Sequence, residues 1–306
     1  MKTSPRAAYA ALWVATLVWG ASFPVARYLL QPGADGQAAI SPLVLAALRF
    51  SIASVLLLTP AARALRRAPL GRAEWWYLVL LGQVGVSVYF WLQYVGVQKT
   101  NAGISSIVIL GLIPVFTAVA AWLMRYERFS WLQVAALAIG IGGVWVLGQS
   151  QNGAVAWRGN DLTIGLVALV ANAACFAIYA LLARRLVQRV STLTVTAVSM
   201  TSGAVVLLLA TLVNPGAWNA VPHLHAGEWL AVLYLALVCS VAAYYLFNFA
   251  LTVIPASRAA FLALFEPVVA VALGSAFLGE RLTLLMLAGA ALIALSVALV
   301  LRRGRA

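Results

Sequence analysis

Runs of about twenty apolar residues recur along the whole chain, and they constrain its fold more than any other feature. The 306 residues are 64% hydrophobic and only 9% charged, whereas soluble domains are about 45–50% apolar and about 25% charged. Because a membrane-spanning helix uses about 20 residues, nine or ten spans would occupy nearly the whole chain. This composition excludes an ordinary water-soluble fold and leaves no room for a second, soluble domain.

Apolar runs between turn residues and charges predict ten membrane-spanning helices. We therefore expect an all-α integral membrane protein. The predicted spans cover residues 8–30, 42–60, 75–97, 102–124, 131–149, 161–182, 194–213, 229–251, 256–278 and 282–301. The first run lacks a convincing cleavage site, so we expect it to remain as a span and not to be removed as a signal peptide.

The net charge of +13 is better explained by membrane topology than by a nucleic-acid partner. Fifteen of the 20 basic residues lie in the tails and in alternate loops: Lys2, Arg6, Arg63, Arg66, Arg67, Arg72, Arg125, Arg128, Arg184, Arg185, Arg189, Arg281, Arg302, Arg303 and Arg305. Such alternation follows the positive-inside rule, and no basic face is interleaved with stacking aromatic residues. We expect both termini in the cytoplasm and the chain in the plasma membrane, which is the inner membrane of a bacterium.

A shift of 153 positions reveals an internal repeat. It places Ser87 on Ser240, Trp91 on Tyr244, Pro114 on Pro267 and Glu127 on Glu280. Each half, residues 1–150 and residues 151–306, then contains five spans. Because five is odd, the second half must enter the membrane upside down, which is the inverted-repeat architecture of secondary transporters. A functional site is expected near the bilayer midplane between the halves.

Several short motifs resemble the EamA family of the drug/metabolite transporter (DMT) superfamily. They are Trp19-Gly20-Ala21-Ser22-Phe23-Pro24, Arg49-Phe50, the block from Pro114 to Glu127, Glu266-Pro267 and Leu278-Gly279-Glu280-Arg281. The resemblance covers essentially the whole chain and implies ten helices in two inverted halves and export of small metabolites. By length and general likeness the sequence is also similar to aromatic amino acid exporters of the YddG type.

The second half departs from the first at two places in this pattern. Cys175-Phe176-Ala177 replaces the Trp-Gly-Ala start of the first motif, and Ser199 lies near the position that corresponds to Arg49. We therefore expect the two halves to contact a substrate in different ways.

Two ionisable residues lie deep inside predicted spans, where charge is costly and usually functional. Arg49 lies about 12 Å along the second span and Glu266 about 15 Å along the ninth, at about 1.5 Å per residue. Both depths are measured from the predicted outer side, so the two groups could pair or jointly bind a zwitterion, with the guanidinium on a carboxylate and the glutamate on an ammonium. The alternative is that each is a structural anchor hydrogen-bonded to helix ends.

Two spans carry polar and aromatic residues at helical spacing, which places them on one face of each helix. The third span has Gln83, Ser87, Trp91 and Tyr94, and the eighth has Ser240, Tyr244 and Asn248. As repeat partners these stripes could form facing walls of a substrate cavity, although polar packing between helices is the alternative for any single residue. Weaker candidates for the same cavity are Trp19, Ser22, Phe23 and Tyr179.

Three prolines lie within predicted spans: Pro24, Pro114 and Pro267. The last two deprive the carbonyls of Leu110 and Ala263 of their helical donors. The resulting kinks could act as hinges, present carbonyls to a ligand, or only shape the bundle.

The motifs favour a transporter over an enzyme. His223 and His225 are the only histidines, no in-span acid pair or catalytic triad is present, and both cysteines lie in apolar runs. We therefore expect no cofactor, no metal site and, without a phosphate-binding loop, no ATP hydrolysis. The expected partners are the lipid bilayer and a small-molecule substrate, and the working unit is expected to be a monomer.

The deep charges also bear on the substrate. A single clearly buried arginine suits a substrate with at most one carboxylate, and aromatic walls suit an amphipathic amino acid, aromatic ones included. Multidrug efflux and sugar-phosphate or nucleotide-sugar transport are the alternatives. Direction of transport and proton coupling stay open from the sequence, with Glu266 as the one clear carboxylate at depth.

Overall fold

The computed structural model describes residues 4–32, 39–67, 69–100, 102–124, 131–149, 160–269 and 283–302. Within these ranges every regular element is a helix. Six helices are long and apolar enough to cross a membrane: Pro5–Leu29, Pro42–Arg66, Arg72–Lys99, Thr163–Leu186, Thr192–Thr211 and Ala226–Ala250. Shorter apolar helical stretches cover Val108–Leu123, Trp131–Val146 and Leu287–Leu299. The protein is thus an all-α membrane protein in its described parts.

The helices of the first half follow the predicted spans to within a few residues at most ends. They are α1 (Pro5–Leu29), α2 (Pro42–Arg67), α3 (Arg72–Gly82), the π-helical segment η1 (Gln83–Ser87), α4 (Val88–Lys99), α5 (Ala102–Leu123) and α6 (Trp131–Gln149). The largest difference is that α2 continues through Pro60 to Arg67. The prediction ended this span at residue 60 because proline interrupts the apolar pattern there, but the helix goes on as a basic turn.

The second half repeats this order after residue 160. It contains α7 (Asn160–Leu186), α8 (Thr192–Thr211), the short 3₁₀ turns η2 (Pro215–Trp218) and η3 (Val221–His223), α9 (Ala226–Leu233), the π-helical segment η4 (Tyr234–Ala242), α10 (Ala243–Ala250), α11 (Ala256–Ala263) and α13 (Leu284–Arg302). The segments α3, η1 and α4 form one continuous rod, and α9, η4 and α10 form another.

The ninth predicted span, residues 256–278, is interrupted in the structure. Helix α11 ends at Ala263, and the chain turns at Leu264 and Phe265 before helical residues resume at Glu266. Pro267 contributes to the break, because it has no N–H to donate to the carbonyl of Ala263. By contrast, α1 and α5 continue through Pro24 and Pro114. Residues 270–278 of this span lie outside the described residues, as do Glu127 and Glu280.

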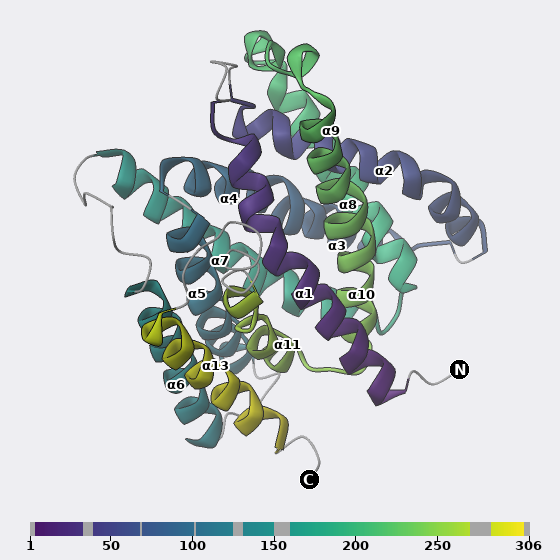
Figure 1. Ribbon diagram of the computed structural model, residues 1–306. Helices are drawn as coiled ribbons and strands as arrows, with labels where there is room; N and C mark the ends of the chain where they lie inside the picture. Colours follow the sequence, from purple (N-terminus) through teal and green to yellow (C-terminus); the bar gives the residue numbers. More distant parts are fainter. Residues whose placement is uncertain are drawn as a thin grey trace.

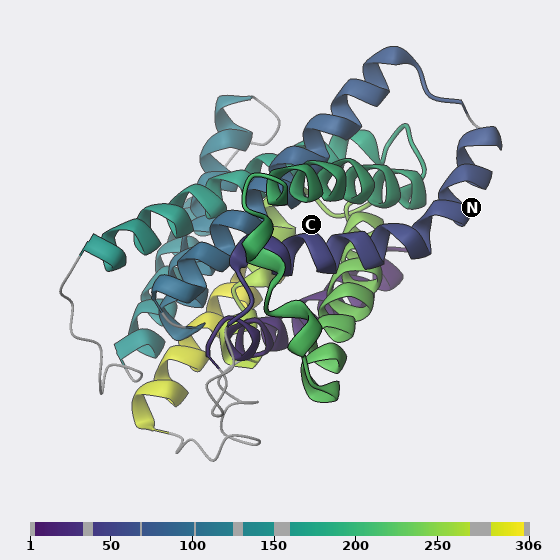
Figure 2. The ribbon, with the colours of Figure 1, turned by 90° about the horizontal axis from the view of Figure 1, so that it is seen from above.

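The bundle is built from helix pairs that cross between the halves. Helix α6 packs on α13, α2 on α8, α1 on α10 and α4 on α7. In Figure 1, α6 and α13 lie together at one corner while α1 crosses the front of the bundle. The view from above in Figure 2 shows α13 toward one side and α2 toward the other. The main buried core runs through α1, α2, α4, α7, α8 and α10, so a site at its centre is lined by both halves.

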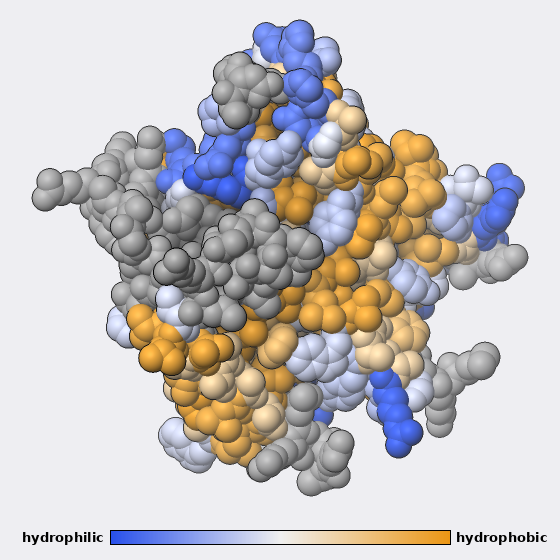
Figure 3. All heavy atoms as spheres, viewed as in Figure 1, coloured by the Kyte–Doolittle hydropathy of each residue, from blue (hydrophilic) through white to orange (hydrophobic). Residues whose placement is uncertain are grey.

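The outer surface of the bundle is apolar. Figure 3 shows a broad hydrophobic surface over the helices, with hydrophilic residues gathered toward the ends of the molecule. Large side chains such as Val55, Trp145, Val167 and Leu209 point outward and are mostly exposed. A contiguous apolar surface of this kind indicates contact with lipid.

Candidate functional site

A small cavity lies in the middle of the bundle, where helices of both halves meet. Its volume is about 20 Å³, enough for ordered water but far below the roughly 300–1,000 Å³ of typical small-molecule pockets. The helices must therefore separate before the cavity can hold a metabolite. Its lining is Trp19, Ser22, Phe23, Arg49, Tyr89, Phe90, Gln93, Leu110, Ile113, Phe176, Tyr244, Ala263 and Glu266.

Arg49 brings a positive charge to the cavity from α2. Its side chain is only 2% exposed, and it donates hydrogen bonds from Nε to Ser240 Oγ at 2.6 Å and from Nη1 to Tyr94 Oη at 2.9 Å. The guanidinium also lies over the rings of Phe90 and Phe50, 4.4 and 5.3 Å from their centroids. These contacts orient the cation but do not neutralise it. Among the described residues no carboxylate forms an ion pair with Arg49.

Glu266 brings a carboxyl group to the cavity from the first helical residue after the turn that follows α11. It is 4% exposed and lines the cavity, yet its side chain makes no hydrogen bond to any described residue. Helix α1 passes very close to this turn, since a Cβ on Gly20 would lie 2.9 Å from the carbonyl oxygen of Glu266. The absence of a side chain at Gly20 thus allows α1 to pack against the residue that carries the acid.

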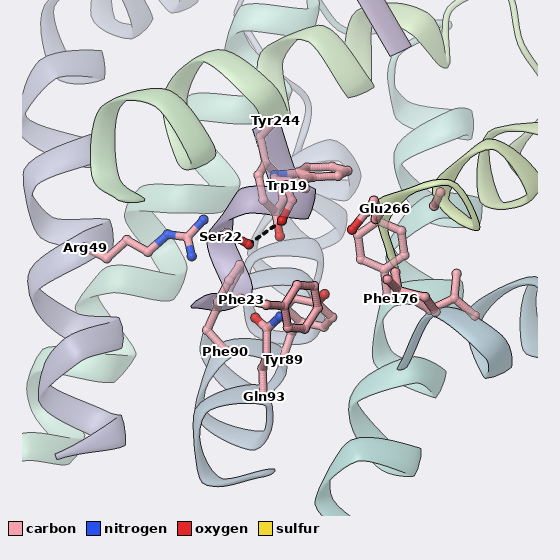
Figure 4. A pocket seen from close by; sticks show the side chains of 13 residues that line it. Trp19, Ser22, Phe23, Arg49, Tyr89, Phe90, Gln93, Phe176, Tyr244 and Glu266 are labelled. Carbon is pink, nitrogen blue, oxygen red and sulfur yellow. Dashed lines mark hydrogen bonds between the residues drawn. The ribbon is translucent and has the colours of Figure 1, made fainter. Parts of the chain in front are cut away.

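Arg49 and Glu266 face the cavity from opposite sides, as Figure 4 shows, with Trp19 and Ser22 between them. They do not form an ion pair with each other. The sequence-based hypothesis allowed direct pairing, joint binding of a zwitterion, or two separate structural anchors. The structure does not show direct pairing, and the other two alternatives stay predictions.

Aromatic rings form the wall between these two groups. Trp19 lies edge-on to Tyr244 and Phe176, with ring centroids 5.3 and 5.9 Å away. The indole is fixed because Nε1 donates to the carbonyl of Cys239 at 2.9 Å. Tyr244 is fixed because its hydroxyl donates to the carbonyl of Gly85 at 3.1 Å. The wall therefore combines a large apolar surface with rings that are already held in position.

The two π-helical segments supply the carbonyls that hold these rings: Gly85 in η1 accepts from Tyr244, and Cys239 in η4 accepts from Trp19. Both segments also contain a serine that bonds back to its own rod. In η1, Ser87 Oγ donates to the carbonyl of Gly82 at 3.4 Å, and in η4, Ser240 Oγ donates to the carbonyl of Leu235 at 3.0 Å. Each acceptor lies five residues before its serine, the spacing of a π-helical turn. Ser87 and Ser240 are also partners in the 153-residue repeat, so both halves use the same local device.

Six of the thirteen predicted binding residues line the cavity: Trp19, Ser22, Phe23, Arg49, Tyr244 and Glu266. Tyr94 and Ser240 lie behind this lining as the hydrogen-bond partners of Arg49.

Four other predicted residues form contacts between helices and do not line the cavity. Tyr179 Oη donates to Asn248 Oδ1 at 3.0 Å, and Asn248 Nδ2 donates to Thr196 Oγ1 at 3.0 Å. Ser87 Oγ donates to Gln83 Oε1 at 2.7 Å and lies 3.2 Å from the carbonyl oxygen of Gly203, where η1 meets α8. Interhelical packing, the alternative considered from the sequence, describes these contacts.

Trp91 is not brought to the cavity, since 46% of its side chain is exposed on the outside of the bundle. The predicted stripe from Gln83 to Tyr94 was centred too far toward Trp91 around the axis of the rod, since Trp91 and Tyr94 lie in the same regular helix α4 but only Tyr94 is buried. The face of α4 that points inward is centred on Phe90 and Gln93, which lie to one side of that stripe.

The sequence reasoning missed Tyr89, Phe90, Gln93 and Phe176 in the lining. Phe90 and Gln93 are three residues apart, and Gln93 directly precedes Tyr94. A search for a second helical stripe beside Tyr94 would therefore have found both. Phe176 had been noted only as a departure from the Trp-Gly-Ala motif, and the structure places its ring against Trp19.

Comparison with known proteins identifies the group to which the chain is similar. The sequence profile of the EamA-like transporter family matches residues 6–149 and 163–302. The uncharacterized transporters YvbV and YwfM of Bacillus subtilis are 25% and 31% identical, over 100% and 68% of this chain and 95% and 67% of theirs. A probable terminal-alkyne amino-acid exporter of Streptantibioticus cattleyicolor is 28% identical over 96% of this chain and 93% of its own length.

The fold is also that of a known crystal structure. The two chains superpose with a TM-score of 0.77 at 21% sequence identity, over 99% of each chain. The profile match, which covers most of both halves, shows that the chain belongs to the EamA-like transporter family.

Proposed function

We propose that the protein is a secondary exporter of small amphipathic metabolites, amino acids with aromatic side chains among them. The observation that carries this proposal is the pair of buried, mutually unpaired charges, Arg49 and Glu266, on opposite sides of one aromatic-lined cavity. A zwitterion offers a carboxylate to Arg49 and an ammonium to Glu266, and its apolar side chain suits the ring surface of Trp19 and Phe176.

Alternating access between two inverted five-helix repeats, residues 1–150 and 151–306, is the proposed mechanism. The family profile matches the chain in two segments of similar length. The repeat also maps each of these observed helix pairs onto an observed helix pair. Thus α1 packs on α10 as α4 packs on α7, while α2 and α6 each pack on their own repeat partners, α8 and α13. A cavity too small for a metabolite fits a closed state of such a cycle.

Orientation and assembly complete the proposal. Basic residues in alternate loops favour an inner-membrane protein with ten spans and both termini in the cytoplasm. One chain suffices as the working unit, because the cavity is lined by elements of a single chain.

A sugar-phosphate or nucleotide-sugar substrate is less favoured by the same lining. Phosphate groups are usually met by several basic side chains, and Arg49 is the one basic residue that lines the cavity in the described part of the chain. Efflux of an apolar drug would leave both Arg49 and Glu266 without a partner.

Counterflow in proteoliposomes tests the proposal. Vesicles containing the purified protein are preloaded with unlabelled solute, and uptake of labelled aromatic amino acids, a sugar phosphate and a lipophilic cation is compared with and without a pH gradient. We expect uptake of the amino acids. Arg49→Gln and Glu266→Gln should each reduce it about tenfold or more, since losing a hydrogen bond to a charged group costs about 1.5–3 kcal/mol.

Arg63→Gln is the matched control for Arg49→Gln, because Arg63 is exposed near the end of the same helix α2. Its uptake should equal that of the wild type. Full amino acid uptake by a correctly inserted Arg49→Gln or Glu266→Gln variant would contradict the role of that residue. Uptake of the sugar phosphate or the cation alone would replace the proposed substrate class.

A further inference from the structure

Gln93 presents an unused polar group to the cavity. The residue lies on α4, lines the cavity and is only 6% exposed. Its amide oxygen is buried and has no hydrogen-bond partner among the described residues. A buried amide without partners is unfavourable, and such groups in native proteins are usually satisfied by a ligand or by water.

Two other amides of the same bundle use both their oxygen and their nitrogen, whereas Asn172 on α7 also leaves its oxygen unpaired but does not line the cavity. Gln83, on the same rod, donates to the carbonyls of Val79 and Ser202 and accepts from Ser87. Asn248 accepts from Tyr179 and donates to Thr196. Gln93 and Asn172 each have a buried amide oxygen without a partner in the described part of the chain, and of the two only Gln93 lines the cavity, which points to a ligand there.

The place of Gln93 indicates which part of a ligand it would meet. Figure 4 shows Gln93 beside Tyr89 and Phe90, with Arg49 on one flank of the cavity and Glu266 on the other. In the proposed function, Arg49 and Glu266 hold the carboxylate and the ammonium of a zwitterion. Gln93 is then left for the side-chain end of the substrate, among the aromatic rings.

We propose that Gln93 is a specificity-determining residue that accepts a hydrogen bond from a donor on the substrate's aromatic side chain. A phenol O–H or an indole N–H satisfies the amide oxygen, whereas a plain phenyl ring leaves it buried and unpaired. Sites built to hydrogen-bond a substrate hydroxyl discriminate strongly against the analogue that lacks it. The substrate class is therefore narrowed to amphipathic amino acids such as tyrosine and tryptophan, ahead of phenylalanine. This inference rests on the proposed function.

Selectivity of the wild-type protein gives the first test. Labelled tyrosine uptake is competed with unlabelled tyrosine, 4-aminophenylalanine, O-methyltyrosine and phenylalanine. The first two carry a side-chain donor and the last two do not. We expect the donors to compete about tenfold or more better. Equal competition by all four would overturn the inference.

Gln93→Met gives the second test, because methionine keeps the length of the side chain but has no amide. We expect weaker uptake of tyrosine, with phenylalanine uptake kept or improved, so that the ratio between them falls to about one. Phenylalanine uptake serves as the folding control within the same sample. Gln98→Met is the matched control, since Gln98 is exposed on the same helix, and it should keep the wild-type ratio.

The outcomes separate this inference from the proposed function. Uptake of tyrosine and phenylalanine with an unchanged ratio in Gln93→Met overturns the role of Gln93 alone, and Gln93 then holds only water. Wild-type vesicles that take up neither amino acid overturn the proposed function, and the inference falls with it. If Gln93→Met is inactive toward both, the analogue competition with the wild type decides.

Discussion

The two π-helical segments are alike in position and backbone but differ in what they hold. The segment η1, in the first half, faces α8: Ser87 Oγ lies against the carbonyl of Gly203, and Gln83 donates to that of Ser202. The segment η4, in the second half, faces the cavity, where Ser240 accepts from Arg49 and the carbonyl of Cys239 accepts from Trp19. Each segment holds one cavity ring, Tyr244 by η1 and Trp19 by η4, but the serine of η1 joins helices whereas the serine of η4 binds Arg49.

The difference follows from an asymmetry between the halves at a single position. Ser199 lies near the position that corresponds to Arg49 in the second half, and the Ser199 hydroxyl donates to carbonyls of its own helix. Without an arginine on α8 there is no cation for η1 to hold, and α8 can instead pack closely against it. The two π-helical segments therefore face different partners, since α8 packs against η1 and Arg49 of α2 binds Ser240 of η4.

Gly82→Ala tests the close packing of the first rod against α8, and it should have the largest effect. A Cβ at Gly82 would lie 2.0 Å from Ser202 Oγ and 2.3 Å from the carbonyl oxygen of Ser199. The hydroxyl can rotate away, but the backbone carbonyl cannot, so α3 and α8 must move apart. We expect a loss on the order of 3 kcal/mol in stability, measured as a lower thermal midpoint of the purified protein in detergent.

Gly142→Ala is the control for this substitution. Among the described residues, no atom beyond the neighbours and helix backbone of Gly142 lies within 4 Å of a Cβ placed there. Alanine is also a better helix former than glycine, so the midpoint should stay the same or rise slightly. If Gly82→Ala has the same midpoint as Gly142→Ala, close packing of η1 against α8 does not contribute to stability.

Ser240→Ala compared with Ser87→Ala tests the functional side. Ser240→Ala removes the acceptor of Arg49 Nε and leaves a buried charged donor unpaired, at a cost of about 1.5–3 kcal/mol. We expect amino acid uptake per inserted protein to fall about tenfold, which corresponds to the lower end of that free-energy cost. Ser87→Ala loses only contacts between neutral groups, and its uptake should equal that of the wild type. Equal uptake by the two variants would remove the distinction between the segments.

Much of the fold could be predicted from the sequence, because long uncharged apolar runs have few alternatives to membrane helices. The π-helical segments could not, since one extra residue per turn leaves composition and hydropathy unchanged. Trp91 was placed in the cavity and Gln93 was missed for another reason, because the predicted stripe was centred to one side of the inward face of α4. The break at Leu264 needed the structure as well, because Pro24 and Pro114 show that proline alone does not end a helix here.

The site was predictable where charge was the signal. Arg49 and Glu266 were identified because ionisable groups at depth are costly, and the structure places both on the cavity. The aromatic lining was only partly identified, since aromatic residues also occupy lipid-facing positions, as Trp91 does.

A fixed 153-residue shift also hides one repeated feature: Arg27 and Gln31 recur as Arg184 and Gln188, 157 positions later.

These arginines cap the far ends of the two rods that contain η1 and η4, and their substitution should have the smallest effect. Arg27 Nη1 donates to the carbonyls of Val97 at 2.7 Å and Thr100 at 3.2 Å, at the end of α4. Arg184 donates to the carbonyl of Leu251, at the end of α10. A cation at a helix C-terminus contributes about 0.3–1 kcal/mol, so each Arg→Gln substitution should lower the thermal midpoint only slightly.

The second rod should lose less than the first. Gln188 Nε2 donates to the carbonyl of Thr252 at 3.0 Å and reaches that of Leu251 at 3.4 Å, so a donor remains when Arg184 is replaced. We expect Arg27→Gln to lower the midpoint more than Arg184→Gln, and Gln188→Ala in the Arg184→Gln background to remove that difference. An equal shift for both single variants would show that Gln188 does not replace the arginine, and that the two rods end in equivalent caps although their π-helical segments differ.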